Sequence, residues 1–396
     1  MKRLLAFLVG LTAVFLLGGC SSQGKPADPP PSVQAEAREN GVVVTFPMAD
    51  GVEYWIFYAP SNSLTSTNFT TVSGGRLLPG AVSPQLIAGL TNGTTYYFTI
   101  NGRTHGGPGG PGTPLVSATP RLAGSDWAAG VPIAPTDIRS VAYGTQFVAV
   151  GAGGKMFSSS DGIAWTAQSF VASGELSRIR YGAGIYVALG AGALILTSSD
   201  TATWNVQTTD TTSDLHDLTT DSIGTYVAVG ANGVIVVSSG GGSWSRASSG
   251  TGSNLYSVMY AGGRYVAVGA GGIAVTSTDA VNWTSVPSQS TRDLRSITYD
   301  FALGRFVAVG AAGTVVTSTD GLTWTLQAPL SAKDLNEVLV GSQVVAVGAD
   351  GVIFISADGL SWQAAASGTS STLNAVAYGN SGYVAVGAAG ASLRSY

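Results

Sequence analysis

The sequence has few of the residues on which enzyme and metal sites most often depend. Its 396 residues include one cysteine and two histidines, and only 10% of them are charged. A single cysteine excludes a disulfide framework and a thiolate metal site, and two histidines are too few for an imidazole zinc site. We therefore expect no metal and no cofactor. The formal net charge is −4, which does not suggest a protein that neutralises the phosphates of a nucleic acid. We therefore expect no nucleic-acid partner.

The few acidic residues of the C-terminal part do not mark a catalytic centre. From residue 126 onward there are two glutamates, Glu175 and Glu337, and one histidine, His216. No serine carries a nucleophile-elbow pattern, and no spacing singles out a pair of carboxylates. We predict no catalytic residue, although a carboxylate pair built from one glutamate and one of several aspartates stays open.

Glycine and tryptophan, by contrast, recur in a regular pattern. Each repeat holds a β-rich segment with Val-Ala-Val-Gly, or Val-Ala-Leu-Gly in one repeat, followed by a glycine turn, as in Arg305 to Thr325. A period near 40 residues with several strands in each repeat is typical of a β-propeller, because small sheets must stack on copies of themselves. Seven tryptophans stand 38, 39, 40, 39, 41 and 38 residues apart: Trp127, Trp165, Trp204, Trp244, Trp283, Trp324 and Trp362.

The two ends of this array are complementary. Trp127 has no three preceding strands of its own, whereas the last repeat, Leu373 to Tyr396, stops before any tryptophan. Six whole repeats and two fragments make seven blades, and the strand at Trp127 would complete the C-terminal sheet. We predict an all-β protein in which residues 121–396 form a seven-bladed β-propeller closed by an N-terminal strand.

The turn before each tryptophan reads Ser/Thr-x-Asp-Gly-x-x-Trp or a variant of it. This pattern resembles the Asp-box (BNR) motif of sialidase-like and photosystem II assembly factor-like propellers, and Val-Ala-Val-Gly matches the second family best. We expect the carboxylate to accept backbone N–H bonds and the tryptophan to pack between sheets, which is a structural role. The residues of this predicted structural set are Asp161, Trp165, Asp200, Trp204, Asp279, Trp283, Asp320, Trp324, Asp358 and Trp362.

The repeats differ most where each first strand begins, at the pattern acid-Leu-x-x-Val. Because first strands line the channel of a propeller, the residues after the leucine would ring one mouth of that channel. Large polar and aromatic side chains there suit a binding face, and a merely solvated rim is the alternative. The predicted binding residues are Arg139, His216, Tyr256, Arg295, Asn336 and Asn374.

Residues 32–120 form a separate β-rich region. The stretch Gly89 to Phe98 (GLTNGTTYYF) resembles the signature of fibronectin type III domains. This resemblance implies a β-sandwich in which Tyr96 bonds back to the backbone of its turn. Phe46 stands where that family usually has a core tryptophan. We expect the segment Arg103 to Pro114 (RTHGGPGGPGTP) to be a loop, because it is too rich in glycine and proline for a strand.

Residues 1–19 resemble a bacterial lipoprotein signal peptide. Lys2 and Arg3 precede a short apolar run, and Leu17-Gly18-Gly19-Cys20 resembles a lipobox. The resemblance implies that Cys20 is lipidated and that the membrane is a partner, at the outer membrane if the host is Gram-negative. Residues 20–31 read as a polar, proline-rich tether.

These features together indicate a lipid-anchored, extracytoplasmic binding or assembly platform. Its partner would be a protein or a polysaccharide that meets the propeller at the channel mouth. One alternative is a carbohydrate-active enzyme, a glycosidase or lyase, on the same propeller. The other alternative is a purely structural scaffold of the cell envelope.

Overall fold

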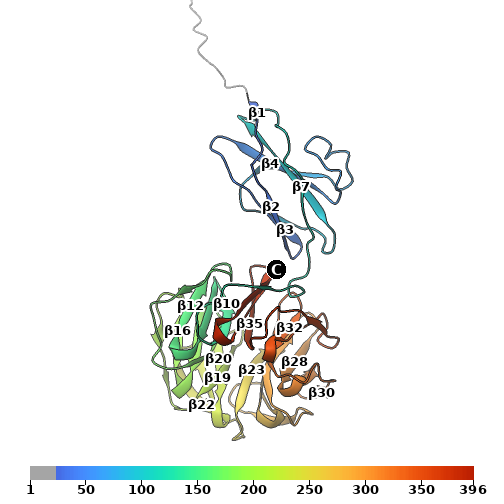
Figure 1. Ribbon diagram of the computed structural model, residues 1–396. Coiled ribbons are helices and arrows are strands. Elements are labelled where there is room, and N and C mark those ends of the chain that lie inside the picture. Colours follow the sequence, from blue (N-terminus) through green and yellow to red (C-terminus); the bar gives the residue numbers. More distant parts are fainter. Residues whose placement is uncertain (1–23) are drawn as a thin grey trace, which may run out of the picture. The chain divides into compact units, whose positions relative to one another are not determined.

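The computed structural model describes residues 24–396, so the predicted signal peptide and Cys20 lie outside the described residues. The described chain divides into two compact units, one of residues 24–36 and 41–119 and the other of residues 37–40 and 120–396 (Figure 1). Both units are built from β-strands joined by turns, which confirms the prediction of an all-β protein. Within residues 24–396, no helix is long and apolar enough to cross a membrane.

The first unit contains two sheets that share one core. One sheet has the order β1-β7-β4-β5 with β8 paired to β7, and the other has the order β2-β3-β6. Val42 and Val44 of β3 meet Ile56 and Ile100 of the larger sheet, and Phe46 joins them at 4% exposure. The strands are β1 (Lys25–Ala27), β2 (Gln34–Arg38), β3 (Gly41–Thr45), β4 (Glu53–Ala59), β5 (Arg76–Ala81), β6 (Gln85–Ala88), β7 (Tyr96–Thr104) and β8 (Val116–Ala118).

Two expectations for this unit need correction. The segment expected to be a free tether contains β1, which pairs antiparallel with β7. The strand β7 itself continues through Arg103 and Thr104, the first two residues of the segment expected to be a loop. Glycine explains both differences, because it allows backbones to approach closely. A Cβ at Gly107 would lie 2.0 Å from the carbonyl carbon of Gly24, so only glycine lets this loop lie against the start of β1.

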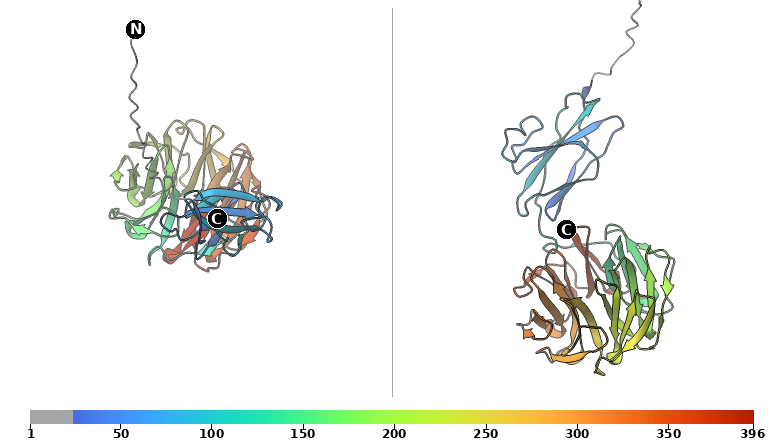
Figure 2. Two further views of the ribbon diagram at one scale, coloured as in Figure 1. Left: turned by 90° about the horizontal axis from the view of Figure 1, so that it is seen from above. Right: turned by 180° about the vertical axis from the view of Figure 1, so that it is seen from behind.

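The second unit is a ring of seven small sheets, antiparallel except where β18 pairs parallel with β22 in the third sheet (Figures 1 and 2). The first strand of each sheet contacts the first strands of both neighbouring sheets, and β35 contacts β10, so the ring is closed. The sheets, each in its hydrogen-bonded order, are β10 (Ile138–Tyr143), β11 (Phe147–Gly151), β12 (Met156–Ser159), β13 (Thr166–Ala167); β14 (Leu176–Gly182), β15 (Ile185–Gly190), β16 (Ile195–Ser198), β17 (Asn205–Val206); β19 (Leu215–Thr220), β20 (Thr225–Gly230), β21 (Ile235–Ser239), β22 (Ser243–Ala247), β18 (Thr208–Thr209); β23 (Leu255–Ala261), β24 (Arg264–Gly269), β25 (Ile273–Ser277), β26 (Thr284–Pro287); β27 (Leu294–Asp300), β28 (Arg305–Gly310), β29 (Val315–Ser318), β30 (Thr325–Leu326); β31 (Leu335–Val340), β32 (Val344–Gly348), β33 (Ile353–Ser356), β34 (Gln363–Ala365); and β35 (Leu373–Gly379), β36 (Gly382–Gly387), β37 (Ser392–Ser395), β9 (Ala128–Ala129).

The seventh sheet is completed by a strand from the start of the unit. Strand β9 pairs antiparallel with β37, with Ala128 opposite Arg394. Trp127 beside it is buried, and its indole Nε1 donates to the carbonyl oxygen of Gly124 at 2.8 Å. This pairing confirms the predicted closure, in which the first strand and the last three strands belong to one sheet.

The core of the ring lies between neighbouring sheets. Val148 and Met156 of the first sheet, for example, pack with Tyr186 and Leu196 of the second. Strands of the Val-Ala-Val-Gly type are apolar throughout because both of their faces are covered. Their final glycine is in an extended conformation, and a Cβ at Gly310 would lie 1.9 Å from the carbonyl oxygen of Asp293.

A 3-10 turn follows the second strand of every sheet, and its middle residue has a positive φ. Glycine, asparagine or aspartate fills this position in five of the turns, as the conformation favours, and alanine fills it in two. The turns are η1 (Ala152–Gly154), η2 (Ala191–Ala193), η3 (Ala231–Gly233), η4 (Ala270–Gly272), η5 (Ala311–Gly313), η6 (Ala349–Gly351) and η7 (Ala388–Gly390).

Candidate functional site

The ring has two faces with different chemistry, because all seven first strands run through it in the same direction. We call the face where these strands begin the strand-start face, and the face where they finish the strand-end face. The four main strands of each sheet alternate in direction, as β10, β11, β12 and β13 do. The 3-10 turns therefore lie on the strand-start face, and the Asp-box turns lie on the strand-end face.

The predicted binding residues lie on the strand-start face, and their side chains bridge neighbouring sheets. Three of them contact the carbonyl oxygen of the residue that opens the next first strand. These contacts are His216 Nδ1 to Leu255 at 2.9 Å, Asn336 Nδ2 to Leu373 at 2.9 Å, and Asn374 Nδ2 to Ile138 at 2.8 Å. Ser177 makes the same bond to Leu215 at 2.6 Å. The position after the leucine thus serves as a clip from sheet to sheet.

The arginines of this face are also engaged within the ring. Arg139 forms an ion pair with Glu175 at 2.6 Å. Arg295 forms an ion pair with Asp334 at 2.8 Å and donates to Asn336 Oδ1 at 2.9 Å. Tyr256 packs against His216, with ring centroids 5.7 Å apart. Binding by these residues stays a prediction that nothing in the structure tests, and their polar groups hold sheets together.

In six of the seven repeats, the residue before the leucine or isoleucine has a second structural role. Asp334 Oδ1 accepts the backbone N–H of Ala312 in the 3-10 turn of the preceding sheet, at 2.8 Å. This backbone bond, aided by Arg295 against the opposing effect of burial, lowers the pKa of Asp334 below its ordinary value. The same bond is made by Asp137, Glu175, Asp214, Asn254 and Asp293.

Inside the ring, one layer of buried side chains closes the channel. Arg178, which is 6% exposed, donates from Nε to Asp217 at 2.8 Å and from Nη1 to Glu337 at 2.7 Å. Arg178 and Asp217 come from the adjacent second and third sheets, whereas Glu337 comes from the sixth sheet, so the Arg178–Glu337 ion pair spans the ring. The residues at this repeat position are Ser140, Arg178, Asp217, Ser257, Ser296, Glu337 and Ala375, all of them buried.

The charges of this layer compensate one another. Burial alone would raise the pKa of Asp217, but the guanidinium groups of Arg178 and Arg180 and a bond from Ser257 outweigh it and hold that pKa well below its usual range. Burial likewise would lower the pKa of Arg178, and the carboxylates of Asp217 and Glu337 outweigh it and raise that pKa. Arg178 and Asp217 are therefore ionised at neutral pH.

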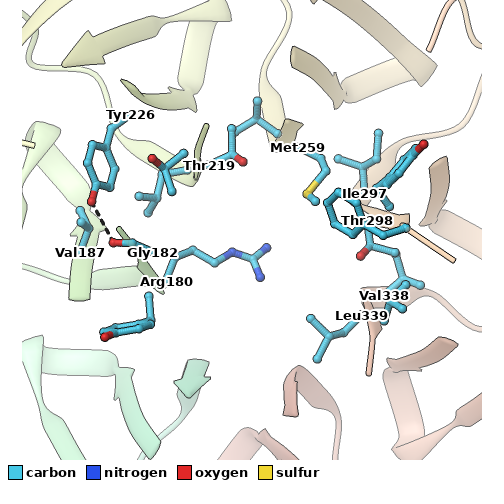
Figure 3. A pocket seen from close by; sticks show the side chains of 17 residues that line it. Arg180, Gly182, Val187, Thr219, Tyr226, Met259, Ile297, Thr298, Val338 and Leu339 are labelled. Atoms are coloured by element: carbon cyan, nitrogen blue, oxygen red, sulfur yellow. Dashed lines mark hydrogen bonds between the residues drawn. The ribbon is translucent and has the colours of Figure 1, made fainter. Parts of the chain in front are cut away.

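A cavity of about 310 Å³ lies between this layer and the strand-end face (Figure 3). On each first strand that contributes, the wall residue stands two residues after the residue of the buried layer. The wall residues are Arg180, Thr219, Met259, Thr298 and Leu339. Hydroxyl, thioether and aliphatic groups alternate around one guanidinium. The cavity is thus apolar on most sides, with a cation at its centre.

Arg180 is the charged group that a ligand in the cavity would meet. Its side chain is 27% exposed, and Figure 3 shows the guanidinium projecting toward the middle of the cavity. Nε donates to Asp217 Oδ1 at 3.1 Å, Nη2 lies 3.3 Å from Asp217 Oδ2, and Nη1 lies 3.4 Å from Glu337 Oε1. A guanidinium has five N–H groups, so these contacts leave donors for a ligand.

Aromatic and aliphatic side chains surround the mouth of the cavity. Tyr181 and Tyr299 line it. Tyr181 packs at a tilt against Tyr186 with ring centroids 4.7 Å apart, and Tyr299 packs edge-on against Phe306 with centroids 4.6 Å apart. Phe301, in the turn between β27 and β28, is 72% exposed. Leu303 in the same turn and Ile223 in the matching turn of the third sheet are also exposed. The mouth therefore offers an apolar surface that the ring itself does not use.

The Asp-box turns surround this mouth at a larger radius and have the expected local geometry. Asp320 Oδ1 accepts the backbone N–H groups of Leu322 and Thr323 at 2.8 and 2.7 Å. These backbone bonds lower the pKa of Asp320 to about 2. Asp161, Asp200, Asp279 and Asp358 make the same pair of bonds.

The tryptophans of the motif differ in their polar contacts. Trp204 and Trp283 donate Nε1–H to the backbone of their own turns at 3.2 and 2.8 Å. Trp165, Trp324 and Trp362 pack without such a partner. Apolar packing is what all five share.

The cavity residues are those that sequence reasoning missed. A signal was present: four positions after each leucine, the repeats read Ala142, Arg180, Thr219, Met259, Thr298, Leu339 and Ala377, which vary as much as the predicted mouth. In the part of the chain that the structure describes, no group of three or more His, Cys, Asp and Glu side chains gathers in a way that could hold a metal.

Comparison with known proteins identifies the type of fold. No protein-family model and no curated protein matches the chain. Among solved structures, YCF48 from Cyanidioschyzon merolae aligns with a TM-score of 0.56 and 17% identity over 68% of this chain and 98% of its own. YCF48 bound to D1 peptide aligns with 0.57 and 17% over 70% and 99%. The WD40 β-propeller domain of Doa1 aligns with 0.57 and 11% over 69% and 97%. The chain thus shares the β-propeller fold of YCF48 and of WD40 proteins.

Proposed function

We propose that this protein is a binding platform that takes a peptide segment of a protein partner at the strand-end face of its propeller. The observation that carries the proposal is the cavity on the ring's axis, where Arg180 projects between apolar walls. A concave, mostly apolar site with a few convergent polar groups is the usual form of a binding pocket. On the strand-start face, three of the predicted binding residues are instead engaged in clips to the next sheet.

The surroundings of the cavity favour a macromolecular partner over a free small molecule. Phe301 and Ile223 are 72% and 87% exposed, on turns of the fifth and third sheets at the same face. Large aromatic residues at the edge of a pocket are typical anchor points of protein interfaces. A peptide can fill the cavity and continue over these side chains, whereas a small metabolite would leave them exposed to water.

The comparison with YCF48 supports this proposal without deciding it. That protein has been solved with a D1 peptide bound, and it has the same propeller fold. At 17% identity the likeness concerns the fold alone, so the choice of this cavity rests on the geometry of this chain.

The arrangement of carboxylates argues against the carbohydrate-active enzyme. A glycosidase needs two carboxyl groups facing its substrate, one of them able to carry a proton. All residues that line the cavity belong to the described part of the chain, and none of them is acidic. Asp217 and Glu337 lie beneath Arg180 at 0% and 1% exposure, and both are paired with arginine.

The other parts of the chain complete the proposal. We propose that residues 1–19 are a lipoprotein signal peptide and that the membrane is reached through a lipidated Cys20, at the outer membrane if the host is Gram-negative. Residues 32–120 would then be a fibronectin type III-like module that carries the propeller of residues 121–396. Two sheets with one core support this, as does Thr91, whose backbone N–H donates to the Tyr96 hydroxyl at 3.3 Å.

Site-specific photo-crosslinking in cells that make the full chain tests the binding proposal. Benzoylphenylalanine replaces Phe301 on the strand-end face or, as a matched control, Val131, which is 74% exposed and precedes the first strand β10. We expect Phe301 adducts to map by mass spectrometry to one short segment of a partner protein. Equal labelling from both positions, or none from Phe301, would contradict the proposal, and the latter result would favour a purely structural scaffold.

A further inference from the structure

We infer that the cavity receives the C-terminal end of a polypeptide, with the terminal carboxylate on Arg180 and apolar side chains against the walls. The inference rests on the proposed function, since it names the part of a partner that the same cavity recognises. Three observations carry it: the shape of the cavity, the sign of its only exposed charge, and the chemistry of its walls.

The cavity is a dead end along the axis of the ring. It opens toward the strand-end face, whereas the buried layer of Arg178, Asp217 and Glu337 closes it below. An internal segment of a chain would have to enter and leave through the same mouth. A chain end has to pass through that mouth only once, so a terminus fits this shape better than a loop.

The exposed charge selects which end of the chain enters. Arg180 presents a guanidinium, and the lining contains no carboxylate among the described residues. An N-terminal ammonium would therefore meet a cation and find no anionic partner. A terminal carboxylate finds N–H donors, and arginine binds carboxylates with well-defined geometry.

The charges beneath Arg180 hold it in place for this role. Asp217 takes bonds from both Nε and Nη2, and Glu337 lies beside Nη1. These carboxylates are buried, so they hold the guanidinium from below and do not occupy the side of it that faces the cavity. Arg178 and Arg180 together balance the charges of Asp217 and Glu337, and what Arg180 keeps for a ligand is the N–H donors that these carboxylates do not use.

The walls indicate what precedes the carboxylate. Met259, Leu339 and Val340 form apolar surface, while Thr219 and Thr298 add hydroxyl groups that can bond the last peptide units. The Thr219 hydroxyl already accepts the backbone N–H of Tyr260 at 3.1 Å, which leaves its own hydrogen available as a donor. A cavity of about 310 Å³ has room for the final residue and part of the one before it.

The test compares two pools of synthetic hexapeptides that share the same sequences with apolar residues at the last two positions. One pool ends in a free carboxylate and the other in a carboxamide. Each is incubated with the full chain, and retained peptides are quantified by mass spectrometry and then measured singly by fluorescence anisotropy. We expect the carboxylate form to bind about ten-fold or more tightly, as the loss of a charged hydrogen bond implies.

Variants assign the preference to the cavity. Arg180→Gln should abolish the difference between the two pools, whereas Arg246→Gln, an exposed arginine of the outer strand β22, should leave it unchanged. Met259→Glu is a second probe that keeps every ion pair and places a carboxylate in the cavity, and it should weaken binding of the carboxylate form selectively. Thermal unfolding of each variant shows whether a loss of binding reflects a loss of folding.

The outcomes separate the two proposals. Equal binding of both pools that is lost in Phe301→Ser overturns the terminal carboxylate and leaves peptide binding in place. Retention of neither pool by the wild-type chain overturns both. A carboxylate preference that persists in Arg180→Gln and Met259→Glu shows that another site is responsible, and this also overturns the inference.

Discussion

The strand-start and strand-end faces of the propeller are made from the same repeats, yet they use variable residues in opposite ways. On the strand-start face, side chains such as Asn336 and His216 reach the backbone of the next sheet. On the strand-end face, Arg180 points into a cavity and Phe301 into solvent. Variation between repeats therefore marks positions where repeats need not agree, and only the contacts of each side chain show whether a position serves the fold or a ligand.

Acid should produce the largest effect, because carboxylates hold both faces. Asp334 on one face and Asp320 on the other have a lowered pKa, which is about 2 for Asp320. An unfolded aspartate has a pKa of about 3.9, so the unfolded chain binds protons first as the pH falls. Stability should be complete above about pH 5 and decline between about pH 4 and about pH 2. Urea unfolding followed by tryptophan fluorescence checks this, and a midpoint that does not change over that range would contradict it.

Asp217→Asn should cause the largest loss of stability of any single substitution in the channel. It leaves Arg178 with one fewer carboxylate in a buried site, where breaking an ion pair costs about 3–5 kcal/mol. Asp126→Asn is the matched control, since its ion pair with Arg121 is exposed and worth at most about 1 kcal/mol. Urea unfolding measures both. Similar small losses in the two variants would show that the buried layer does not stabilise the ring.

Asn336→Ala should separate the roles of the two faces. The variant loses the clip to Leu373 and the contact with Arg295, so we expect its unfolding free energy to fall by about 1–2 kcal/mol. Peptide binding should not change, because the residue lies on the strand-start face. If binding decreases while the fold stays intact, the strand-start face takes part in recognition after all.

Phe301→Ser should have the smallest effect on stability and a large one on binding. Because the side chain is 72% exposed, its removal should change the unfolding free energy by less than about 0.5 kcal/mol. Peptide affinity should fall several-fold if Phe301 anchors the partner. Val131→Ser, at 74% exposure, is the control that should change neither quantity. A Phe301→Ser variant with unchanged affinity would remove the mouth from the proposed interface.

The architecture could be predicted from the sequence because the same pattern of strands and turns recurs in every repeat. Seven tryptophans and the missing strands at the two ends were enough to predict the pairing of β9 with β37. The Asp-box bonds were also accessible, since Asp320 and its partners lie within three residues of one another.

The site was not accessible in the same way, because its contacts join different repeats. Arg178 reaches Glu337 across 159 residues, and the sequence gives no distance between them. A hint existed in the repeat alignment, where Arg178, Asp217 and Glu337 occupy one position with opposite charges among serines and alanine. The clips escaped prediction for the same reason, because Asn336 binds a carbonyl group 37 residues away in the next sheet.

Amide hydrogen exchange of the full chain with a saturating carboxylate-ended peptide is the most direct test of the binding face. We predict slower exchange in the turns after the first strands, around residues 221–225 and 300–304, and no change in the 3-10 turns at residues 152–154 and 311–313. Protection confined to the 3-10 turns would place the ligand on the strand-start face and contradict the account.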